Sequence, residues 1–411
     1  MSDTATAGSV SGRCAPGFEG VREEFERNFA ERRELGASVC VRVGGQPVVD
    51  LWGGIADPDT GRAWESDTVN VIFSATKGAA LACVHLLAAR GEIELERRVA
   101  DYWPAFARRG KETVTIHDVL THRCGVPAVR ARLPEGIVFE PEQIADLVAA
   151  EPPFFPPGER HAYAGLTIGV VLDALVRRTD GRSLGRYFAE ELAGPLGLDF
   201  WIGAPPQIEP RIAPMQLPEI DPATAPEFFL LTADPESIPG LLFGNSGGYL
   251  SDGPNGFNSR RAHAAEIPGG GGIANARGLS GLYVPFAAPG KDHAGVQFDP
   301  DAIAWMSTAH AAGWDHTLHL NIRYGLGWML SFDNRWRPGR TQGSMILGPG
   351  AFGHSGFGGA LGFADPEHDL AYGYTMNRMS CAASIGVRSQ SLVDAVYRAL
   401  GARGTDSGAW R

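Results

Sequence analysis

Residues 74–90 have the sequence Ser74-Ala-Thr-Lys77-Gly-Ala-Ala-Leu-Ala-Cys-Val-His-Leu-Leu-Ala-Ala-Arg90. Helix-forming residues dominate this segment, Ser74 stands at its start and Gly91 follows its end, which together predict a helix. Apolar residues occupy nearly every face, so the helix is expected to be buried. A buried helix with a hydroxyl and an amine in its first turn is the feature from which we derive both fold and function.

Ser74 and Lys77 are three residues apart, so a helix places both side chains on one face, one turn apart. A Ser hydroxyl is a weak nucleophile until a base takes its proton, and a Lys is a usable base only where burial or a positive potential lowers its pKa. Free amides at the helix N-terminus could stabilise an oxyanion. The alternative is structural, with Ser74 as a helix cap and Lys77 extending its amine to solvent.

The basic residues also direct attention to Lys77. Of 36 Lys and Arg residues only three are Lys, namely Lys77, Lys111 and Lys291. Arg cannot lose its proton in a protein, whereas Lys can. Each Lys is therefore a candidate for a role that Arg cannot fill, although chance alone could account for any one of them.

Composition limits the class of protein. The 411 residues are 44% hydrophobic and 20% charged, which indicates a globular protein of two domains or one large composite fold. A net charge of −11 argues against nucleic acid or an anionic membrane as the main partner. The five Cys are scattered without a CxxC, which favours reduced thiols over a disulfide scaffold or zinc ribbon. We expect a cytoplasmic protein, because residues 1–16 look like a disordered tail rather than a signal peptide and no long apolar span follows.

The order of the predicted elements indicates two parts. A helix at 17–35 precedes a hairpin of 36–43 and 47–52 around Gly44-Gly45, and strands return at 324–331, 360–364 and 370–376 before a helix at 390–400. Helices are predicted between them at 114–121, 141–150, 166–179, 183–192 and 274–286, and residues 205–258 look like an irregular surface excursion. We therefore predict an α/β domain from residues 17–72 and 323–411, a mostly helical domain from 73–322, and an active site in the cleft between them.

Two further segments carry residues suited to the same chemistry. Tyr163 precedes the helix at 166–179, where a phenol near a Lys could relay a proton; the alternative is a core Tyr. The segment Gly353-His-Ser-Gly-Phe-Gly-Gly359 is rich in glycine, which has no side chain and would let a substrate approach the backbone. The Phe357 amide could be a second oxyanion donor, and His354 could orient the substrate or Tyr163, unless it is a satisfied interior His.

Four motifs now occur in a fixed order: Ser74-Ala-Thr-Lys77, Leu120-Thr-His-Arg-Cys-Gly-Val-Pro127, the Pro-Gly segment before Tyr163, and His354-Ser355-Gly356. Their order and spacing, with Pro195-Leu-Gly-Leu198, resemble the serine β-lactamase-like superfamily, and class C β-lactamases and family VIII carboxylesterases in particular. The resemblance runs from about residue 20 to about residue 400. It implies an antiparallel sheet flanked by helices, an inserted all-helical domain, and no metal or organic cofactor.

The resemblance also implies roles for individual residues. Ser74 would be the nucleophile, Lys77 the base and Tyr163 the proton relay. The backbone amides of Ser74 and Phe357 would form the oxyanion hole, and His354, Ser355 and Gly356 would contact the substrate.

Three departures from the class C pattern bear on the substrate. Tyr163-Ala-Gly165 replaces Tyr-x-Asn, His354-Ser-Gly356 replaces Lys-Thr-Gly, and Val129 stands where a Gln holds the acylamido group. Because groups that would grip a β-lactam are missing, we predict a carboxylesterase that acts on short-chain or small-molecule esters through an acyl-enzyme. The alternatives are an acyltransferase or an amide or β-lactam hydrolase with the same site, and a non-catalytic binding protein. The oligomeric state stays open, with a homodimer among the alternatives.

Other motif matches are discounted. Ser183 and Ser246 each lie in a Gly-x-Ser-x-Gly match, but a nucleophile elbow needs a strand before and a helix after the Ser. Ser183 is instead predicted to cap the helix at 183–192. The run Gly269–Gly272 lacks the Lys of a phosphate loop, and His316 and His319 lack a nearby third metal ligand.

Overall fold

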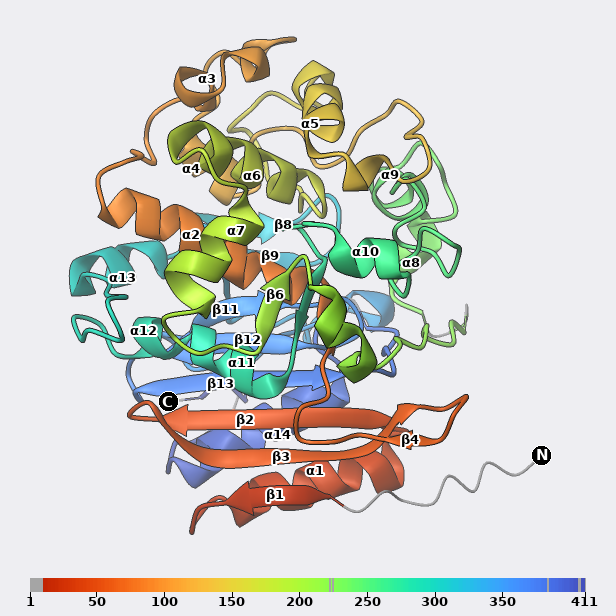
Figure 1. Cartoon of the computed structure of the whole chain (residues 1–411), viewed down its shortest axis with the longest axis vertical. Helices are drawn as coiled ribbons and strands as arrows, with labels where there is room; N and C mark the ends of the chain where they lie inside the picture. Colours follow the sequence, from red (N-terminus) through yellow and green to blue (C-terminus); the bar gives the residue numbers. More distant parts are fainter. Residues whose placement is uncertain (1–9, 222, 224, 383, 406–407, 411) are drawn as a thin grey trace.

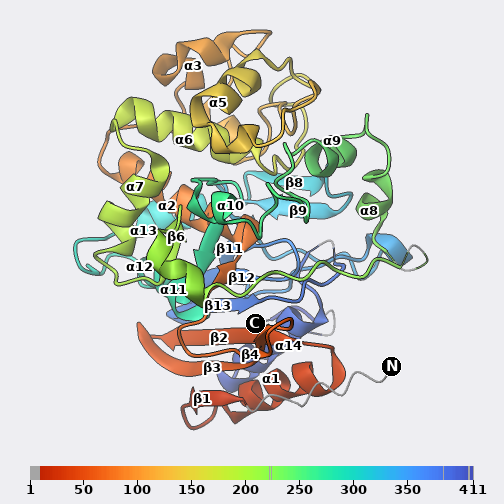
Figure 2. The same cartoon turned by 45° about the vertical axis from the view of Figure 1, so that its right-hand side comes forward.

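The computed structural model describes residues 10–221, 223, 225–382, 384–405 and 408–410. An antiparallel sheet carries helices on both faces, and a helical region adjoins one end of the sheet (Figures 1 and 2). In Figure 1, α11 (Ala276–Leu282) and α12 (Val284–Ala287) lie in front of the sheet, with α1 (Glu19–Glu31) and α14 (Val387–Ala399) behind it. This arrangement confirms the predicted fold class.

The ten strands of the large sheet come from both ends of the chain. Their order is β1-β3-β2-β13-β12-β11-β10-β9-β8, with β4 paired to β3. The strands are β1 (Ser11–Cys14), β2 (Gly36–Val43), β3 (Gln46–Asp57), β4 (Arg62–Ala63), β8 (Ala311–Trp314), β9 (Asn321–Tyr324), β10 (Met329–Leu330), β11 (Phe352–Ser355), β12 (Leu361–Asp365) and β13 (Leu370–Met376). The N-terminal hairpin joins the C-terminal strands where β2 pairs with β13, from Ala37 opposite Met376 to Val43 opposite Leu370.

Three details of the sheet differ from the sequence prediction. Residues 11–14, predicted as part of a disordered tail, form β1 on β3, where Gly12 allows an approach that a Cβ would block at 2.0 Å from the Asp50 carbonyl oxygen. The single strand predicted at 324–331 is two strands, because the chain turns between them with Gly327 at a φ of +88°. The sheet also extends back to β8, so the boundary predicted between residues 322 and 323 falls within it.

The helices near the site follow the predicted pattern with shifted ends. The remaining helices are α2 (Lys77–Ala89), α3 (Val99–Tyr102), α4 (Ile116–Leu120), α5 (Pro141–Ala150), α6 (Thr167–Thr179), α7 (Leu184–Phe188), α8 (Glu227–Leu231), α9 (Ile238–Gly244), α10 (Arg260–Ala264) and α13 (Pro300–Met306). The region is not all-helical, because a small sheet in the order β5-β7-β6 crosses it. Its strands are β5 (Asn70–Val71), β6 (Phe200–Ile202) and β7 (Gly272–Ala274).

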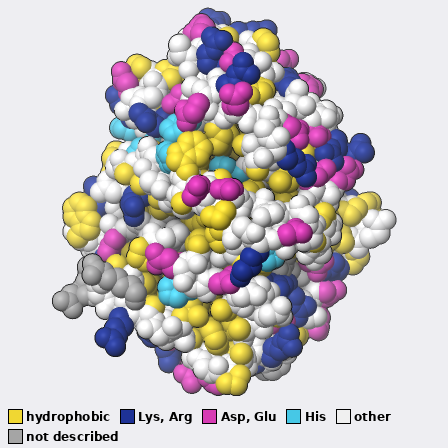
Figure 3. All heavy atoms as spheres, turned by 90° about the vertical axis from the view of Figure 1, so that its left-hand side faces the viewer, with side chains coloured by type: hydrophobic (Ala, Val, Ile, Leu, Met, Phe, Trp, Pro, Cys, Tyr) yellow, Lys and Arg dark blue, Asp and Glu magenta, His cyan; other side chains and the backbone are white. Residues whose placement is uncertain are grey.

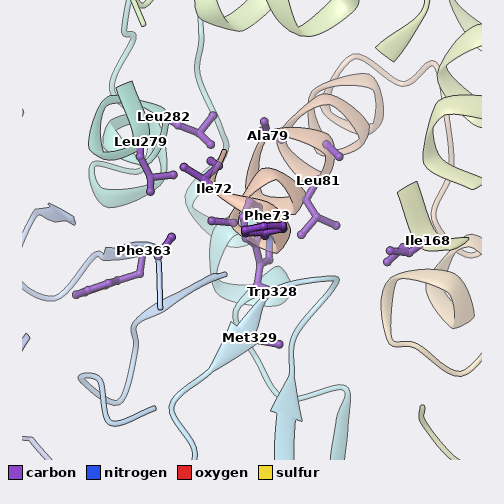
Figure 4. Close-up of a cluster of buried hydrophobic side chains, with 14 of the residues drawn as sticks. Ile72, Phe73, Ala79, Leu81, Ile168, Leu279, Leu282, Trp328, Met329 and Phe363 are labelled. Carbon is purple, nitrogen blue, oxygen red and sulfur yellow. The ribbon is translucent and has the colours of Figure 1, made fainter. Parts of the chain in front are cut away.

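Helix α2 lies at the centre of the molecule, as predicted from its apolar sequence. Every residue from Lys77 to Leu87 is buried. Figure 4 shows Leu282 of α11 and Leu81 of α2 on opposite sides of α2, and the His85 ring of α2 stacks on the Trp328 ring next to β10, with the ring centres 5.9 Å apart. The helix therefore joins the sheet side of the core to the helical region.

The surface carries both signs of charge. On the face shown in Figure 3, acidic and basic side chains are interspersed. Within the described ranges, no helix combines the length and the apolar character that crossing a bilayer would require.

A buried ion pair fastens α14 to the segment that follows α1. Arg388 donates to a Glu34 carboxylate oxygen at 2.6 Å and to the Arg378 carbonyl oxygen at 2.6 Å, and the Tyr374 hydroxyl donates to the other Glu34 oxygen. Burial raises the pKa of Glu34, and the nearby Arg388 charge opposes that rise. Glu34 therefore depends on Arg388 to stay ionised in the core.

We predict that Arg388→Met lowers the free energy of unfolding by about 3–5 kcal/mol, because it leaves the Glu34 carboxylate buried without its cation. The double variant Glu34→Gln/Arg388→Met should regain part of that loss. Urea unfolding at neutral pH measures both, and equal losses in the two variants would contradict the prediction.

Candidate active site

Ser74 lies in a tight turn that feeds α2. Residues Phe73–Thr76 form a 3₁₀ helix, and α2 begins at Lys77. Thr76 stands at the N-cap position of α2 and makes no capping hydrogen bond with its side chain, while Ser74 lies inside the 3₁₀ helix, so the interpretation of Ser74 as the cap of α2 is wrong. Phe73 has a φ of +45°, which is strained for a residue other than glycine and sets the direction in which the turn leaves the preceding strand.

The side chains of Ser74 and Lys77 meet, as their spacing predicted. Lys77 Nζ donates to Ser74 Oγ at 3.0 Å and to the Gly269 carbonyl oxygen at 2.6 Å. The amine also lies 4.9 Å from the centre of the Tyr163 ring. Lys77 is only 1% exposed, and in the described ranges no carboxylate lies within ion-pair distance of it.

Burial therefore decides the charge of Lys77. Removing the ammonium from water lowers the pKa of Lys77 well below its ordinary value. A neutral amine at this position can accept the Ser74 proton across the 3.0 Å contact while it donates to Gly269.

The glycine run 269–272, discounted as a phosphate loop, holds the acceptor for Lys77. Gly272 makes two hydrogen bonds with the chain around the turn. Its carbonyl oxygen accepts from the Ile72 amide at 3.0 Å, and its amide donates to Thr76 Oγ1 at 2.8 Å. The Tyr249 hydroxyl donates to the Gly270 carbonyl oxygen at 2.8 Å. The run was visible in the sequence, but only the fold shows that it faces Lys77.

Tyr163 is buried beside the Ser74–Lys77 pair. Burial raises the pKa of the Tyr163 phenol, and the neighbouring Ser74 hydroxyl opposes that rise, so the phenol stays protonated at neutral pH. The Tyr163 amide donates to Asp315 Oδ2 at 2.9 Å, and the Tyr324 hydroxyl donates to the same oxygen at 3.1 Å. The neighbouring Ala164 amide donates to His122 Nδ1 at 3.1 Å.

Asp315 and His122 were missed as parts of the site. His122 stands in the quoted motif from Leu120 to Pro127, so a signal for it existed. Nothing near Asp315 in the sequence indicates that its buried carboxylate accepts a hydrogen bond from the Tyr163 amide, about 150 positions away.

The end of β11 forms the opposite wall. Ser355, Gly356 and Phe357 line the same pocket as Ser74. A Cβ on Gly356 would lie 2.1 Å from the Ile72 carbonyl oxygen, so only glycine lets this strand approach the nucleophile turn. In the described part of the chain, the Phe357 amide donates no backbone hydrogen bond.

His354 lies behind this wall and does not line the pocket. It is fully buried, its ring centre is 6.0 Å from that of Tyr163, and its Nδ1 donates to the Ser355 carbonyl oxygen at 2.7 Å. Burial lowers the pKa of His354 to about 3, so the ring is neutral at pH 7.

Segment 205–258 is not the surface excursion that its sequence suggested. It supplies four pocket-lining residues, Leu242, Phe243, Tyr249 and Leu250. The Phe243 ring lies 5.3 Å from that of Phe357, and this contact ties the segment to the end of β11. The prediction failed because proline and glycine indicate irregular backbone, which need not be exposed.

The discounted residues have structural partners. Ser183 caps α7, as predicted, and donates to Glu266 at 2.8 Å, whereas Ser246 Oγ accepts from the Leu250 amide at 3.0 Å. Lys111 donates to three backbone carbonyl oxygens, those of Arg108, Ala149 and Glu151. Lys291 pairs with Asp369 at the surface at 3.0 Å.

One cluster has metal-ligand character. Asp365, Glu367 and His368 lie together at the turn between β12 and β13. One Asp365 oxygen already accepts from the Tyr397 hydroxyl at 2.8 Å and from His368 Nδ1 at 3.1 Å. These bonds attach the turn to α14, so a structural role accounts for the cluster.

The chain is similar to known proteins over nearly its whole length. The model of the family described as Beta-lactamase matches residues 22–394. Esterase/beta-lactamase LipL of Mycobacterium tuberculosis (strain ATCC 25618 / H37Rv) is 33% identical over 389 residues, which cover 90% of this chain and 83% of that protein. The crystal structure of a family VIII carboxylesterase is 33% identical with a TM-score of 0.80, and covers 95% of this chain and 100% of its own. A penicillin-binding protein homologue from Caulobacter crescentus is 30% identical with a TM-score of 0.79, at the same coverage.

We predict that Lys77 titrates well below the ordinary lysine value of 10.5, because its amine is buried. With only three Lys in the chain, protein labelled with ¹³C at lysine Cε should give three resolvable resonances. Loss of one resonance in Lys77→Arg assigns it. An assigned resonance that titrates near 10.5 would contradict the prediction.

Proposed function

The chain belongs to the Beta-lactamase family, and from this premise we propose that it is a carboxylesterase that cleaves small-molecule esters through an acyl-enzyme on Ser74. The observation that carries the proposal is the 3.0 Å contact between Ser74 Oγ and a Lys77 amine buried without a counterion in the described structure. Two of the relatives, LipL and the family VIII carboxylesterase, are named as esterases.

In the first half of the reaction, neutral Lys77 takes the proton of Ser74 as Oγ attacks the ester carbonyl carbon. The negative charge moves to the carbonyl oxygen, where the amides of Ser74 and Phe357 would donate to it. As the tetrahedral intermediate collapses, the C–O bond to the alcohol breaks. Tyr163 gives its proton to the departing alkoxide and regains one from the Lys77 ammonium.

In the second half, water attacks the acyl carbon of the ester on Ser74. The water gives its proton to the neutral Lys77 amine through the Tyr163 phenol, which takes up one proton as it passes one on. The bond between the acyl carbon and Ser74 Oγ then breaks, the carboxylic acid is released, and Ser74 Oγ takes its proton back from the Lys77 ammonium. Ser355 and Gly356 would contact the substrate along the pocket wall, while His354 would support Tyr163 from behind.

Esters fit this pocket better than β-lactams. A β-lactam carries a carboxylate and an amide side chain, which need a cation and polar partners. His354 is neutral because its pKa is about 3, and Val129 and Gly165 offer no side-chain hydrogen bond. The pocket wall is mainly apolar. We therefore expect hydrolysis of the β-lactam nitrocefin to be much slower than that of p-nitrophenyl butyrate.

We predict that Ser74→Ala removes nearly all hydrolysis of p-nitrophenyl butyrate. Ser183→Ala is the matched control: it should keep full activity and lose about 1 kcal/mol of stability, the usual cost of a lost helix cap. A spectrophotometric assay on both purified variants tests this. Turnover retained by Ser74→Ala would refute the assignment of the nucleophile.

We predict that Tyr163→Phe slows cleavage of ethyl butyrate roughly 100-fold or more, because ethoxide must be protonated as it leaves. The effect on p-nitrophenyl butyrate should be smaller, since p-nitrophenolate is a good leaving group without a proton. Measuring kcat/KM for both esters in both enzymes gives the comparison. Equal losses on the two substrates would rule out Tyr163 as the acid for the leaving group.

A further inference from the structure

A second apolar chamber lies beside the active-site pocket, between α5, α6 and α9. Its aliphatic walls include Val129, Val138, Ile144 and Val148. Three residues, Leu166, Leu242 and Gly269, line both the chamber and the pocket that contains Ser74. The two spaces are therefore neighbours that share a wall.

The polar side chains around the chamber are already bonded to protein. Asp173 accepts from the Leu184 amide at 2.9 Å, and Glu266 accepts from Ser183 Oγ at 2.8 Å and from the Gly185 amide at 2.9 Å.

The uncharged polar side chains are bonded in the same way. Asn245 accepts from the Leu133 amide at 2.8 Å and donates to two carbonyl oxygens, and Thr167 donates to the Val126 carbonyl oxygen at 2.8 Å. What the chamber offers a ligand is thus aliphatic surface.

Leu242 closes the shared wall next to Tyr163. A Cβ on Gly165 would lie 2.3 Å from Leu242 Cδ1, so the Leu242 side chain packs directly on the backbone two residues after Tyr163. The absence of a side chain at Gly165 is what makes room for it. The partition therefore consists of two aliphatic side chains, those of Leu242 on α9 and Leu166, and a Leu side chain can change rotamer without a change in the backbone.

We propose that this chamber binds the distal methylenes of a linear acyl chain, which makes medium-chain fatty acyl esters the preferred substrates of the proposed esterase. The inference rests on the function proposed above. The acyl group stays on Ser74 until water releases it, whereas the alcohol must depart to solvent. A chamber bounded by buried aliphatic side chains therefore suits the acyl part of the substrate.

The test is a chain-length series with a constant leaving group, from p-nitrophenyl acetate through butyrate and hexanoate to octanoate. In the unaltered enzyme kcat/KM should rise beyond butyrate by about fourfold for each added methylene, the factor expected for burying it. A profile that peaks at acetate and falls steadily would overturn the chamber proposal and leave the esterase assignment intact. Absence of hydrolysis with every ester by folded protein would instead overturn the assignment of function.

Variants of the chamber test whether the acyl chain of the substrate binds there. Val148→Phe fills the chamber from α5 and should lower kcat/KM for octanoate at least tenfold while acetate is little affected. Val176→Phe is the matched control, a buried position on α6 that does not line the chamber, and it should leave the ratio of octanoate to acetate unchanged. If Val148→Phe does not fold, Ile144→Phe, which fills the chamber from the same helix and does not line the pocket of Ser74, should show the same selective loss.

A second series separates the two ends of the substrate. Alkyl acetates with alcohols from ethanol to octanol vary the leaving group alone. Val148→Phe should not change the ratio of octyl to ethyl acetate. A selective loss in this series, with the acyl series unaffected, would show that the chamber holds the alcohol and would overturn the proposal.

Discussion

The burial of one amine, that of Lys77, is the constraint on which the rest of the site depends. An ammonium group removed from water without a counterion is costly, so its proton is held weakly. The Lys77 nitrogen is hydrogen-bonded to two oxygens, Ser74 Oγ and the Gly269 carbonyl oxygen, and lies over the Tyr163 ring. A carboxylate at the same distance would raise the pKa and remove the base.

Glycine makes the close approaches around that amine. At Gly356 the end of β11 packs against the Ile72 carbonyl oxygen. At Gly169 helix α6 packs so closely on Gly269 that an added Cβ would lie 2.1 Å from the Gly269 nitrogen. These two contacts bring the sheet and the helical region onto the same turn of chain. A side chain at Gly356 would push the end of β11 away from Ser74, and a side chain at Gly169 would push Gly269 away from Lys77.

The apolar character of the pocket bears on the substrate class that we propose. Among the proteins similar to this chain, one is named an esterase/beta-lactamase, one a family VIII carboxylesterase and one a penicillin-binding protein homologue. Here His354 is neutral, Gly165 carries no amide, and segment 205–258 contributes aliphatic and aromatic side chains to the wall. In the proposed esterase, these departures from the class C pattern would together favour an uncharged acyl group.

The sequence by itself determined the elements whose signal lies within one or two turns of chain: the buried helix α2, the hairpin of β2 and β3, helix α5, and the spacing that brings Ser74 and Lys77 together. Motif order located Tyr163 and the end of β11. Only the tertiary structure placed Gly269 against Lys77, Asp315 under Tyr163 and Leu242 in the pocket wall. Periodicity and capping are properties of neighbouring residues, whereas these contacts join positions from about 80 to about 190 residues apart, and nothing local in the chain encodes which distant backbone will meet them.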